Sequence, residues 1–199
     1  MPLADCGATL LLMQYAISAG AIVVRGGCLL LVHHRADGYD FWVPPGGRLF
    51  GEESIFECAA RETREETGLH IVPERIVYVE EFVQSGLHFC KFWVVAPDPG
   101  GRLSVDGLGS DEARDAVARF GPDEAHDAVA RCGLEEARAM VARAESGDVH
   151  VVDARFLSRD AMRTLTVYPR VLRNVFWEED LARGFPQTRY LGLQHIEDD

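Results

Sequence analysis

GRLFGEESIFECAARETREETGL, residues 47–69, is the stretch that decides the fold of this 199-residue chain. Its apolar spacing and its flanks predict a helix from about Ser54 to Thr67. Ser54 or the acidic pair before it is suited to begin the helix, and Gly68 is suited to end it. The sequence therefore predicts one helix within this stretch.

Three carboxylates share one face of this predicted helix. At about 100° per residue, Glu62, Glu65 and Glu66 lie beside an apolar stripe that is expected to face the core. The stripe comprises Ile55, Phe56, Ala59, Ala60 and Thr63. Carboxylates at this spacing repel one another and raise each other's pKa, which disfavours a purely structural role. Divalent cations with oxygen ligands would relieve the repulsion, and Mg²⁺ typically uses carboxylates together with substrate phosphates.

Residues around the acidic face support a functional interpretation. Arg61 lies four residues from both Glu57 and Glu65 and can hold a carboxylate in place. Gly46 and Gly47 allow a tight turn and a close approach to a ligand. A solvated charged helix face is the simpler alternative. It does not account for the regular Gly, Glu, Arg-Glu and Glu-Glu-x-Gly spacing, so we favour a functional site.

At these residues the chain resembles the Nudix hydrolase family, whose signature is G-x5-E-x7-R-E-U-x-E-E-x-G-U with U aliphatic. Gly47, Glu53 and Gly68 occupy signature positions, and the one departure is Thr63 at an aliphatic site. The resemblance implies an α/β fold, an α/β/α sandwich around a mixed β-sheet. The resemblance covers roughly residues 14–96 and 149–196. We therefore expect one domain over residues 1–199, in which residues 97–148, where the composition changes and 12-residue repeats occur, form a helical insert.

The resemblance also implies roles for individual residues. Glu62, Glu65 and Glu66 are the expected ligands of Mg²⁺, or of Mn²⁺, with the main-chain carbonyl of Gly46 completing the set. Arg61 and Glu53 are the expected orienting pair, and Glu65 is a catalytic candidate. The implied reaction is attack of a metal-activated water on a diphosphate linked to another group.

Relatives commonly use one further glutamate from beyond the signature. Glu145 is the candidate for this general base or extra ligand, with Asp148 beside it and His150 as a weaker choice. Tyr168, Arg170 and Arg173 are further candidates for contacts with substrate phosphate or ribose, although surface ion pairing is the simpler role for them.

Apolar and alternating stretches predict the strands of the sheet. They are Tyr15–Val24, Cys28–His33, Phe41–Val43, Ile76–Phe82, His88–Ala96, Val149–Phe156 and a short strand around Tyr190–Leu193. A C-terminal helix is predicted over Tyr168–Ala182. Between them, three 12-residue repeats begin at Gly109, Gly121 and Gly133 and predict short helices. A tandem duplication in a surface loop explains these repeats more simply than a lid or a partner surface.

Composition narrows the class of protein. The net charge of −12 argues against nucleic acid as a partner, but permits a phosphate-bearing substrate when metal ions supply positive charge. Five cysteines without a CxxC pair indicate reduced thiols. The apolar stretch from Ala8 to Val24 is too interrupted for a membrane span or a signal peptide, so we expect a cytoplasmic protein. Met13 is an alternative start to Met1.

The sequence supports two functional hypotheses. The first is hydrolysis of a diphosphate linkage in a nucleoside di- or triphosphate or a nucleoside diphosphate conjugate. The second is a non-catalytic nucleotide sensor or interaction module with the same fold, using the repeat insert as a partner surface. Ser85 stands where typical ADP-ribose pyrophosphatases have a proline, and the coenzyme A signature is absent, so the substrate stays open. A homodimer is possible by resemblance.

Overall fold

The computed structural model describes residues 14–36, 39–84, 87–104 and 150–195. The signature helix and the strands of the sheet lie within these ranges. The three repeats, Glu145, Asp148 and the alternative start at Met13 lie outside the described residues.

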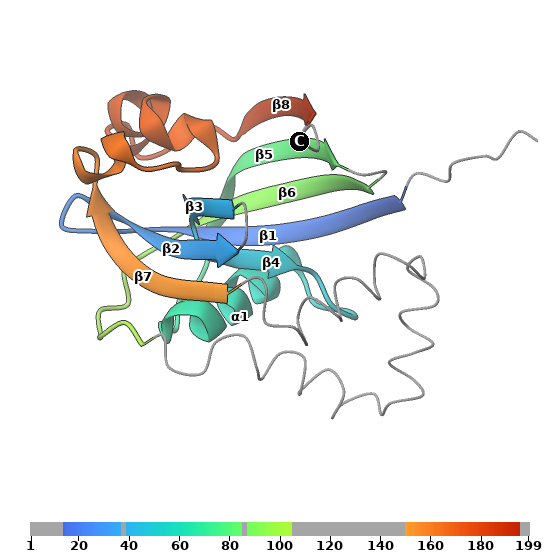
Figure 1. The fold of residues 1–199 in the computed structure, drawn as a ribbon, viewed down its shortest axis with the longest axis horizontal. Helices are drawn as coiled ribbons and strands as arrows, with labels where there is room; N and C mark the ends of the chain where they lie inside the picture. Colours follow the sequence, from blue (N-terminus) through green and yellow to red (C-terminus); the bar gives the residue numbers. More distant parts are fainter. Residues whose placement is uncertain (1–13, 37–38, 85–86, 105–149, 196–199) are drawn as a thin grey trace, which may run out of the picture.

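The described strands form one mixed sheet (Figure 1). Its main path runs β3-β2-β1-β6-β5-β8, with β4 paired to β1 and β7 paired to β2. The strands are β1 (Gln14–Arg25), β2 (Cys28–Ala36), β3 (Tyr39–Val43), β4 (Gly46–Arg48), β5 (Arg75–Gln84), β6 (Leu87–Ala96), β7 (His150–Ser158) and β8 (Arg189–His195). Each predicted strand is therefore present, and each is one to three residues longer than the sequence pattern indicated.

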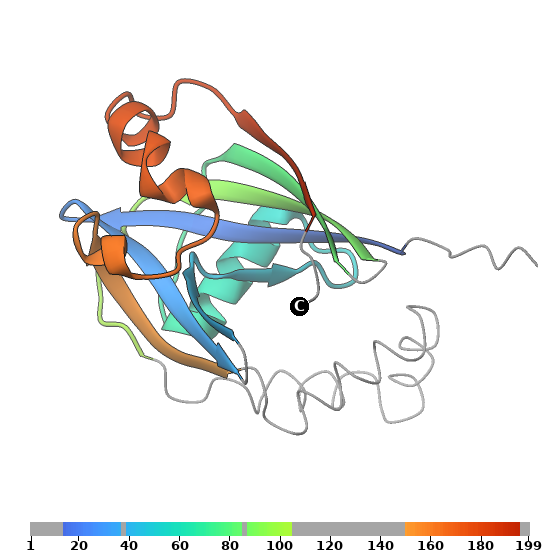
Figure 2. The same cartoon turned by 45° about the horizontal axis from the view of Figure 1, so that its top comes forward.

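Strand β1 joins the two halves of the sheet. It runs parallel to β6 along ten residues, from Gln14 opposite Leu87 to Val23 opposite Ala96. On its other edge it pairs with β4 near Ser18 and with β2 near Val24. Figure 2 shows β1 passing between β2 and β7 on one side and β5, β6 and β8 on the other. Helix α1 (Ile55–Thr67) is the next element after β4, and it packs against β1 and β4 where the two halves of the sheet meet.

Each face of the sheet carries its own apolar core. Helix α1 covers one face, where Cys58 and Ala59 pack with residues of β1, β2 and β6. The other face packs against the C-terminal segment through Met162, Leu172 and Phe176. Figure 1 shows α1 and the C-terminal helical turns on opposite sides of the strands. This is the α/β/α arrangement that the resemblance implied.

Helix α1 begins and ends where the sequence predicted. The Ser54 hydroxyl accepts a hydrogen bond from the Glu57 N–H, and the Glu57 carboxylate accepts one from the Ser54 N–H, which forms a capping box. Gly68 ends the helix in the left-handed conformation with φ of 73°, a conformation that glycine adopts without strain. Both ends of the helix are therefore set by local chemistry.

The buried face of α1 differs from the predicted stripe. Phe56 is 39% exposed, so its assignment to the core was wrong. Glu62 and Glu66 instead lie on the buried face, together with Cys58, Ala59, Thr63 and Thr67. Glycine at position 47 leaves room for the Glu62 carboxylate, and the Gly46 N–H binds Glu66. Partners supplied by the preceding turn therefore permit two carboxylates to be buried.

Two other expectations also need correction. Gly46 and Gly47 were expected to form a tight turn ahead of the helix, but Gly46–Arg48 form the strand β4 against β1. The predicted helix over Tyr168–Ala182 is wrong as one element. It consists of a 3₁₀ turn at Arg170–Arg173 and a π-helical turn at Phe176–Leu181, interrupted at Asn174, where φ is −134°. The backbone at Asn174 is not helical, so the two turns cannot form a continuous helix.

Two expectations from composition can be compared with the structure. The described cysteines, Cys28, Cys58 and Cys90, are free thiols, as expected. In the described ranges, no helix combines the length and the apolar character that crossing a membrane requires.

Candidate active site

Arg61 is the centre of a hydrogen-bond network on α1. Its Nε and Nη2 donate to the two carboxylate oxygens of Glu53 at 3.0 and 2.8 Å. Its Nη1 donates to both Glu62 and Glu65, each at 2.8 Å. Its Nη2 also donates to the main-chain oxygen of Arg48 at 3.0 Å. One guanidinium therefore positions three of the signature carboxylates at once.

Burial and pairing oppose each other in this network. Burial disfavours the charged guanidinium, but the hydrogen bonds that it donates to Glu53 and the other carboxylates raise the pKa of Arg61 above its usual value. Burial likewise opposes ionisation of Glu53, but the Arg61 guanidinium and the Phe50 N–H lower its pKa overall. Both groups are therefore held in their charged forms at neutral pH.

Glu66 is held by a different set of partners. The Gly46 N–H donates to its Oε2 at 2.8 Å, which ties the helix to β4. The His34 Nε2 lies 3.8 Å from its Oε1, too far for a hydrogen bond. Burial, helped by Lys91 and His33, lowers the pKa of His34 to about 4, so the imidazole beside Glu66 is neutral at pH 7.

Gly47 determines where the Glu62 carboxylate can lie. A Cβ atom at position 47 would stand 2.2 Å from Glu62 Oε1, far closer than two such atoms can approach. The neighbouring Cys58 thiol donates to the main-chain oxygens of Gly47 and Arg48 at 3.6 and 3.4 Å. Burial raises the pKa of Cys58 to about 12, so this thiol packs the turn and is not a nucleophile.

The donor atoms of the site suit a hard divalent cation. Glu62, Glu65 and Glu66 offer carboxylate oxygens next to a main-chain turn, which is the donor type that Mg²⁺ prefers. In residues 14–36, 39–84, 87–104 and 150–195, no three His, Cys, Asp or Glu side chains stand close enough together to hold a metal ion. Arg61 and Gly46 occupy the carboxylates instead.

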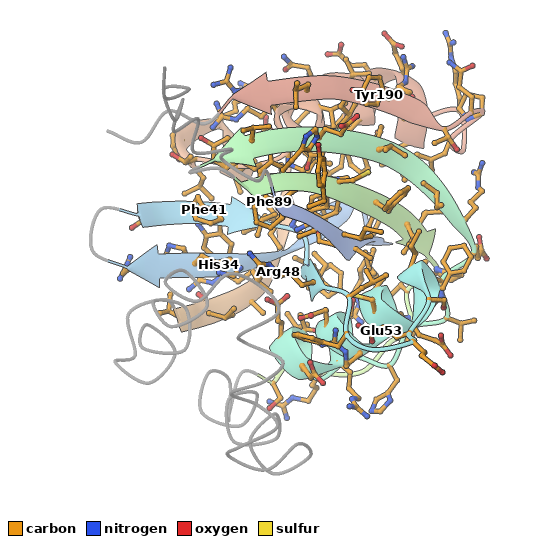
Figure 3. The ribbon with its side chains drawn as sticks, turned by 90° about the vertical axis from the view of Figure 1, so that its right-hand side faces the viewer. His34, Phe41, Arg48, Glu53, Phe89 and Tyr190 are labelled. Atoms are coloured by element: carbon orange, nitrogen blue, oxygen red, sulfur yellow. The ribbon has the colours of Figure 1, made fainter. Side chains whose placement is uncertain are left out.

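Aromatic side chains flank the site (Figure 3). His34 stacks on Phe41 with ring centroids 5.2 Å apart, and Tyr168 meets Phe41 edge-on at 5.9 Å. The Arg48 guanidinium lies over the Phe89 ring at 4.9 Å, and Phe89 stacks on Phe82 at 4.5 Å. The pair of His34 and Phe41 thus adjoins Glu66, and the pair of Arg48 and Phe89 adjoins Arg61.

The structure distinguishes Glu80 from Glu81, which the sequence could not. Glu80 accepts a hydrogen bond from the Trp93 Nε1 at 2.9 Å on the inner face of the sheet. Glu81 points away from it, toward His88 at 2.6 Å and Tyr190 at 2.9 Å. Lys91, opposite Glu80 on β6, is a site neighbour that the sequence analysis missed. A single lysine within an otherwise apolar strand was the available signal.

The predicted site residues fall into two groups. The structure brings together Gly46, Glu53, Arg61, Glu62, Glu65 and Glu66. Glu145 and Asp148 lie outside the described residues, and His150 opens β7 with its backbone opposite Arg35. Arg173 donates to the main-chain oxygen of Leu165 at 2.7 Å, which favours the structural role for it.

Comparison with known proteins agrees with this geometry. The NUDIX domain family matches residues 14–144. The human 8-oxo-dGDP phosphatase NUDT18 is 30% identical over 103 residues, covering 52% of this chain and 31% of the relative. Phosphatase NudJ of Escherichia coli K12 is 30% identical over 67 residues, covering 34% and 44%. The chain thus aligns with less than half the length of these relatives.

Solved structures show the same fold. The E. coli ORF135 protein superposes with a TM-score of 0.55 at 18% identity, covering 87% of this chain and 95% of that one. The MutT protein from Methanosarcina mazei Go1 superposes with a TM-score of 0.53 at 18% identity, covering 83% of this chain and 91% of that one. The family match extends over most of the chain, and three signature carboxylates are gathered around Arg61, so the chain belongs to the Nudix hydrolase family.

Proposed function

We propose that this protein hydrolyses a diphosphate linkage in a nucleoside di- or triphosphate, or in a nucleoside diphosphate conjugate, in a reaction that requires Mg²⁺ or Mn²⁺. The observation that carries the proposal is the Arg61 network, which fixes Glu53, Glu62 and Glu65 beside Glu66. Burying several carboxylates on one helix face costs free energy even when they are paired, so we take this arrangement as support for a ligand-binding role.

In this proposal Glu62, Glu65 and Glu66 hold the divalent cation, with the main chain at Gly46. When bound, the cation supplies an activated water and neutralises charge on the diphosphate. The Gly46 N–H orients the Glu66 carboxylate from one side. Arg61 orients Glu62 and Glu65 from the other side and is itself fixed by Glu53.

Glu65 is our candidate for accepting the proton of the attacking water. Its side chain is 24% exposed, against 6% for Glu62 and 9% for Glu66. A proton acceptor must be within reach of water, and Glu65 meets that condition best of the three. Glu145 stays a prediction for the further carboxylate that relatives draw from beyond the signature.

The names of the relatives guide the choice of substrates. NUDT18 is named for 8-oxo-dGDP, and one solved neighbour of similar fold is a UDP-X diphosphatase. The neutral His34 on Phe41 and the Arg48–Phe89 pair offer flat surfaces of the kind on which a base stacks. Nucleoside diphosphates therefore take first place in a substrate screen.

The screen measures phosphate or nucleotide release from nucleoside di- and triphosphates, 8-oxo-dGDP, ADP-ribose, NADH, sugar nucleotides and dinucleoside polyphosphates. Each substrate is tested with Mg²⁺, with Mn²⁺ and with EDTA. We expect turnover of at least one diphosphate-containing compound, abolished by EDTA. Tight nucleotide binding without turnover of any compound would overturn the proposal and favour the alternative, a nucleotide sensor of the same fold.

A further inference from the structure

Lys91 is the only lysine among the 20 Lys and Arg residues of the chain. It lies near the middle of β6, where its backbone is opposite Ser18 of β1 and Glu80 of β5. Phe89 and Trp93, two residues away on either side, share its face of the sheet. The one ammonium group of the chain's side chains therefore stands on an interior strand, where a charge is unusual.

The ammonium of Lys91 lies within the electrostatic reach of the signature carboxylates Glu62 and Glu66. Glu80, Glu66 and Glu62 all attract its charge, while burial opposes that charge and lowers its pKa. The positive charge of Lys91 also helps to lower the pKa of His34, whose imidazole lies 3.8 Å from Glu66. These mutual effects place Lys91, His34 and Glu66 around the same region.

Local packing holds the Lys91 stem in place. Its Nζ lies 4.4 Å from the centre of the Trp93 ring, within the range of a cation–π contact. The Trp93 indole is fixed in turn by its hydrogen bond to Glu80. Within the described part of the chain, no hydrogen bond or ion pair to the Lys91 ammonium is observed. Three N–H donors are thus presented without an acceptor among the described residues.

The other basic side chains near the carboxylates already have partners within the chain. The Arg61 guanidinium has five N–H donors, and its contacts with Glu53, Glu62, Glu65 and the Arg48 main chain use all of them. The His34 imidazole is stacked on Phe41. The Arg48 guanidinium is stacked over Phe89. Lys91 is the group whose donors stay available for an anion.

We propose that the Lys91 ammonium binds a non-bridging phosphate oxygen of the substrate, beside the carboxylates of α1. This assignment rests on the proposed function and deepens it, because it names the group that receives the diphosphate anion. A lysine ammonium is compact and acts as a point charge on phosphate. Glu80 and Trp93 are positioning residues, which keep the ammonium aimed at the site.

A purely electrostatic role for Lys91 makes a different prediction. If its charge only offsets Glu62, Glu66 and Glu80, its removal changes divalent metal affinity and leaves diphosphate affinity unaltered once metal is saturating. If it contacts phosphate, its removal weakens diphosphate binding at saturating metal. Metal affinity and diphosphate affinity therefore separate the two roles.

The first test uses Lys91→Met, which keeps an unbranched stem against Trp93, and Lys91→Arg, which keeps the charge. Binding of imidodiphosphate, a diphosphate that resists hydrolysis, is measured calorimetrically at saturating Mg²⁺. Loss of a charged hydrogen bond should weaken binding about 10- to 100-fold in Lys91→Met. Lys91→Arg should recover most of that loss. Ser18→Ala, which removes a buried hydroxyl without a partner in the described residues, is the matched neighbour and should bind as wild type.

The single lysine permits a direct spectroscopic test. Protein labelled with [¹³C]lysine gives one Cε–Hε cross-peak, which disappears in Lys91→Arg. Imidodiphosphate added to the Mg²⁺-saturated protein should shift this cross-peak, and adenosine, which has no phosphate, should not. No shift, or equal imidodiphosphate affinity in wild type and Lys91→Met, would overturn the assignment.

The two proposals can fail separately. Binding of imidodiphosphate through Lys91 without turnover of any substrate would refute the hydrolase proposal and leave the Lys91 assignment standing. Turnover with unchanged KM and kcat in Lys91→Met would refute the assignment and leave the hydrolase standing. Failure of wild type to bind imidodiphosphate at saturating Mg²⁺ would refute the assignment as well.

Discussion

The Arg61 guanidinium binds both carboxylate oxygens of Glu53, with Nε–Oε2 and Nη2–Oε1 distances of 3.0 and 2.8 Å. This fork-to-fork contact joins the loop after β4 to the middle of α1. Because the same guanidinium also binds Glu62 and Glu65, the geometry of the acidic face depends on it. A group with fewer donors cannot hold all three carboxylates.

Replacement of Arg61 by lysine should therefore destabilise the fold. An ammonium keeps the charge but leaves several carboxylate oxygens unpaired, so we expect a loss of about 3 kcal/mol in the free energy of unfolding without metal. Urea titration measures it. Arg64→Lys is the control on the same helix, because the Arg64 side chain is half exposed and its contact with Glu65 is long, at 3.7 Å. This substitution should change the free energy of unfolding by less than about 0.5 kcal/mol. Equal effects of the two substitutions would contradict the account.

Gly47→Ala should disable the site without unfolding the protein. The new Cβ occupies the place of the Glu62 carboxylate, so that side chain must move. We expect Mn²⁺ affinity, measured by electron paramagnetic resonance, to fall about 10- to 100-fold. Gly51→Ala is the control, because a Cβ there meets open space although φ is 55°. It should lower stability by about 1 kcal/mol and leave Mn²⁺ affinity unaltered. Wild-type affinity in Gly47→Ala would refute the position assigned to Glu62.

The Glu53 contact should make stability depend on pH. Because the pKa of Glu53 is lowered in the folded protein, its contribution is fully present above the usual glutamate value of about 4.3. It is lost as pH falls through the lower, folded value. At pH 7 the free energy of unfolding of wild type should exceed that of Glu53→Gln by about 1–3 kcal/mol. That difference should shrink below about pH 4 in denaturant titrations. A difference that stays constant down to about pH 3 would mean that Glu53 is not charged in this contact.

Thr63, the departure from the signature, is tolerated because its polar atom is satisfied. Its side chain is fully buried and its hydroxyl donates to the Ala59 main-chain oxygen at 2.7 Å. Thr63→Val should therefore raise stability by up to about 1 kcal/mol and leave activity unchanged. Thr67→Val should stabilise the protein less than Thr63→Val, because the Thr67 hydroxyl also accepts a hydrogen bond from the Leu69 N–H at 3.3 Å. Thermal unfolding of both variants decides the order, and the reverse order would contradict this interpretation.

Local patterns were sufficient to predict much of the structure. The capping box at Ser54, the end of α1 at Gly68 and the positions of the main strands follow from chemistry within a few residues. Contacts between residues far apart in the sequence could not be predicted from such local patterns. Which face of α1 is buried depends on Gly47 and Gly46, and the choice between Glu80 and Glu81 depends on the pairing of β5 with β6. Lys91 was missed because one charge in an apolar strand gives no periodic signal.

The central claim is that α1 supplies the carboxylates on which diphosphate cleavage depends. The most direct test compares the rate of cleavage at saturating Mg²⁺ in wild type, Glu66→Gln and Glu57→Gln, using the best substrate from the screen. Glu57 serves only the capping box at Ser54, so its variant controls for loss of a carboxylate on the same helix. The account predicts a loss of about a hundredfold or more in Glu66→Gln and a nearly unchanged rate in Glu57→Gln. Equal rates in wild type and Glu66→Gln would contradict it.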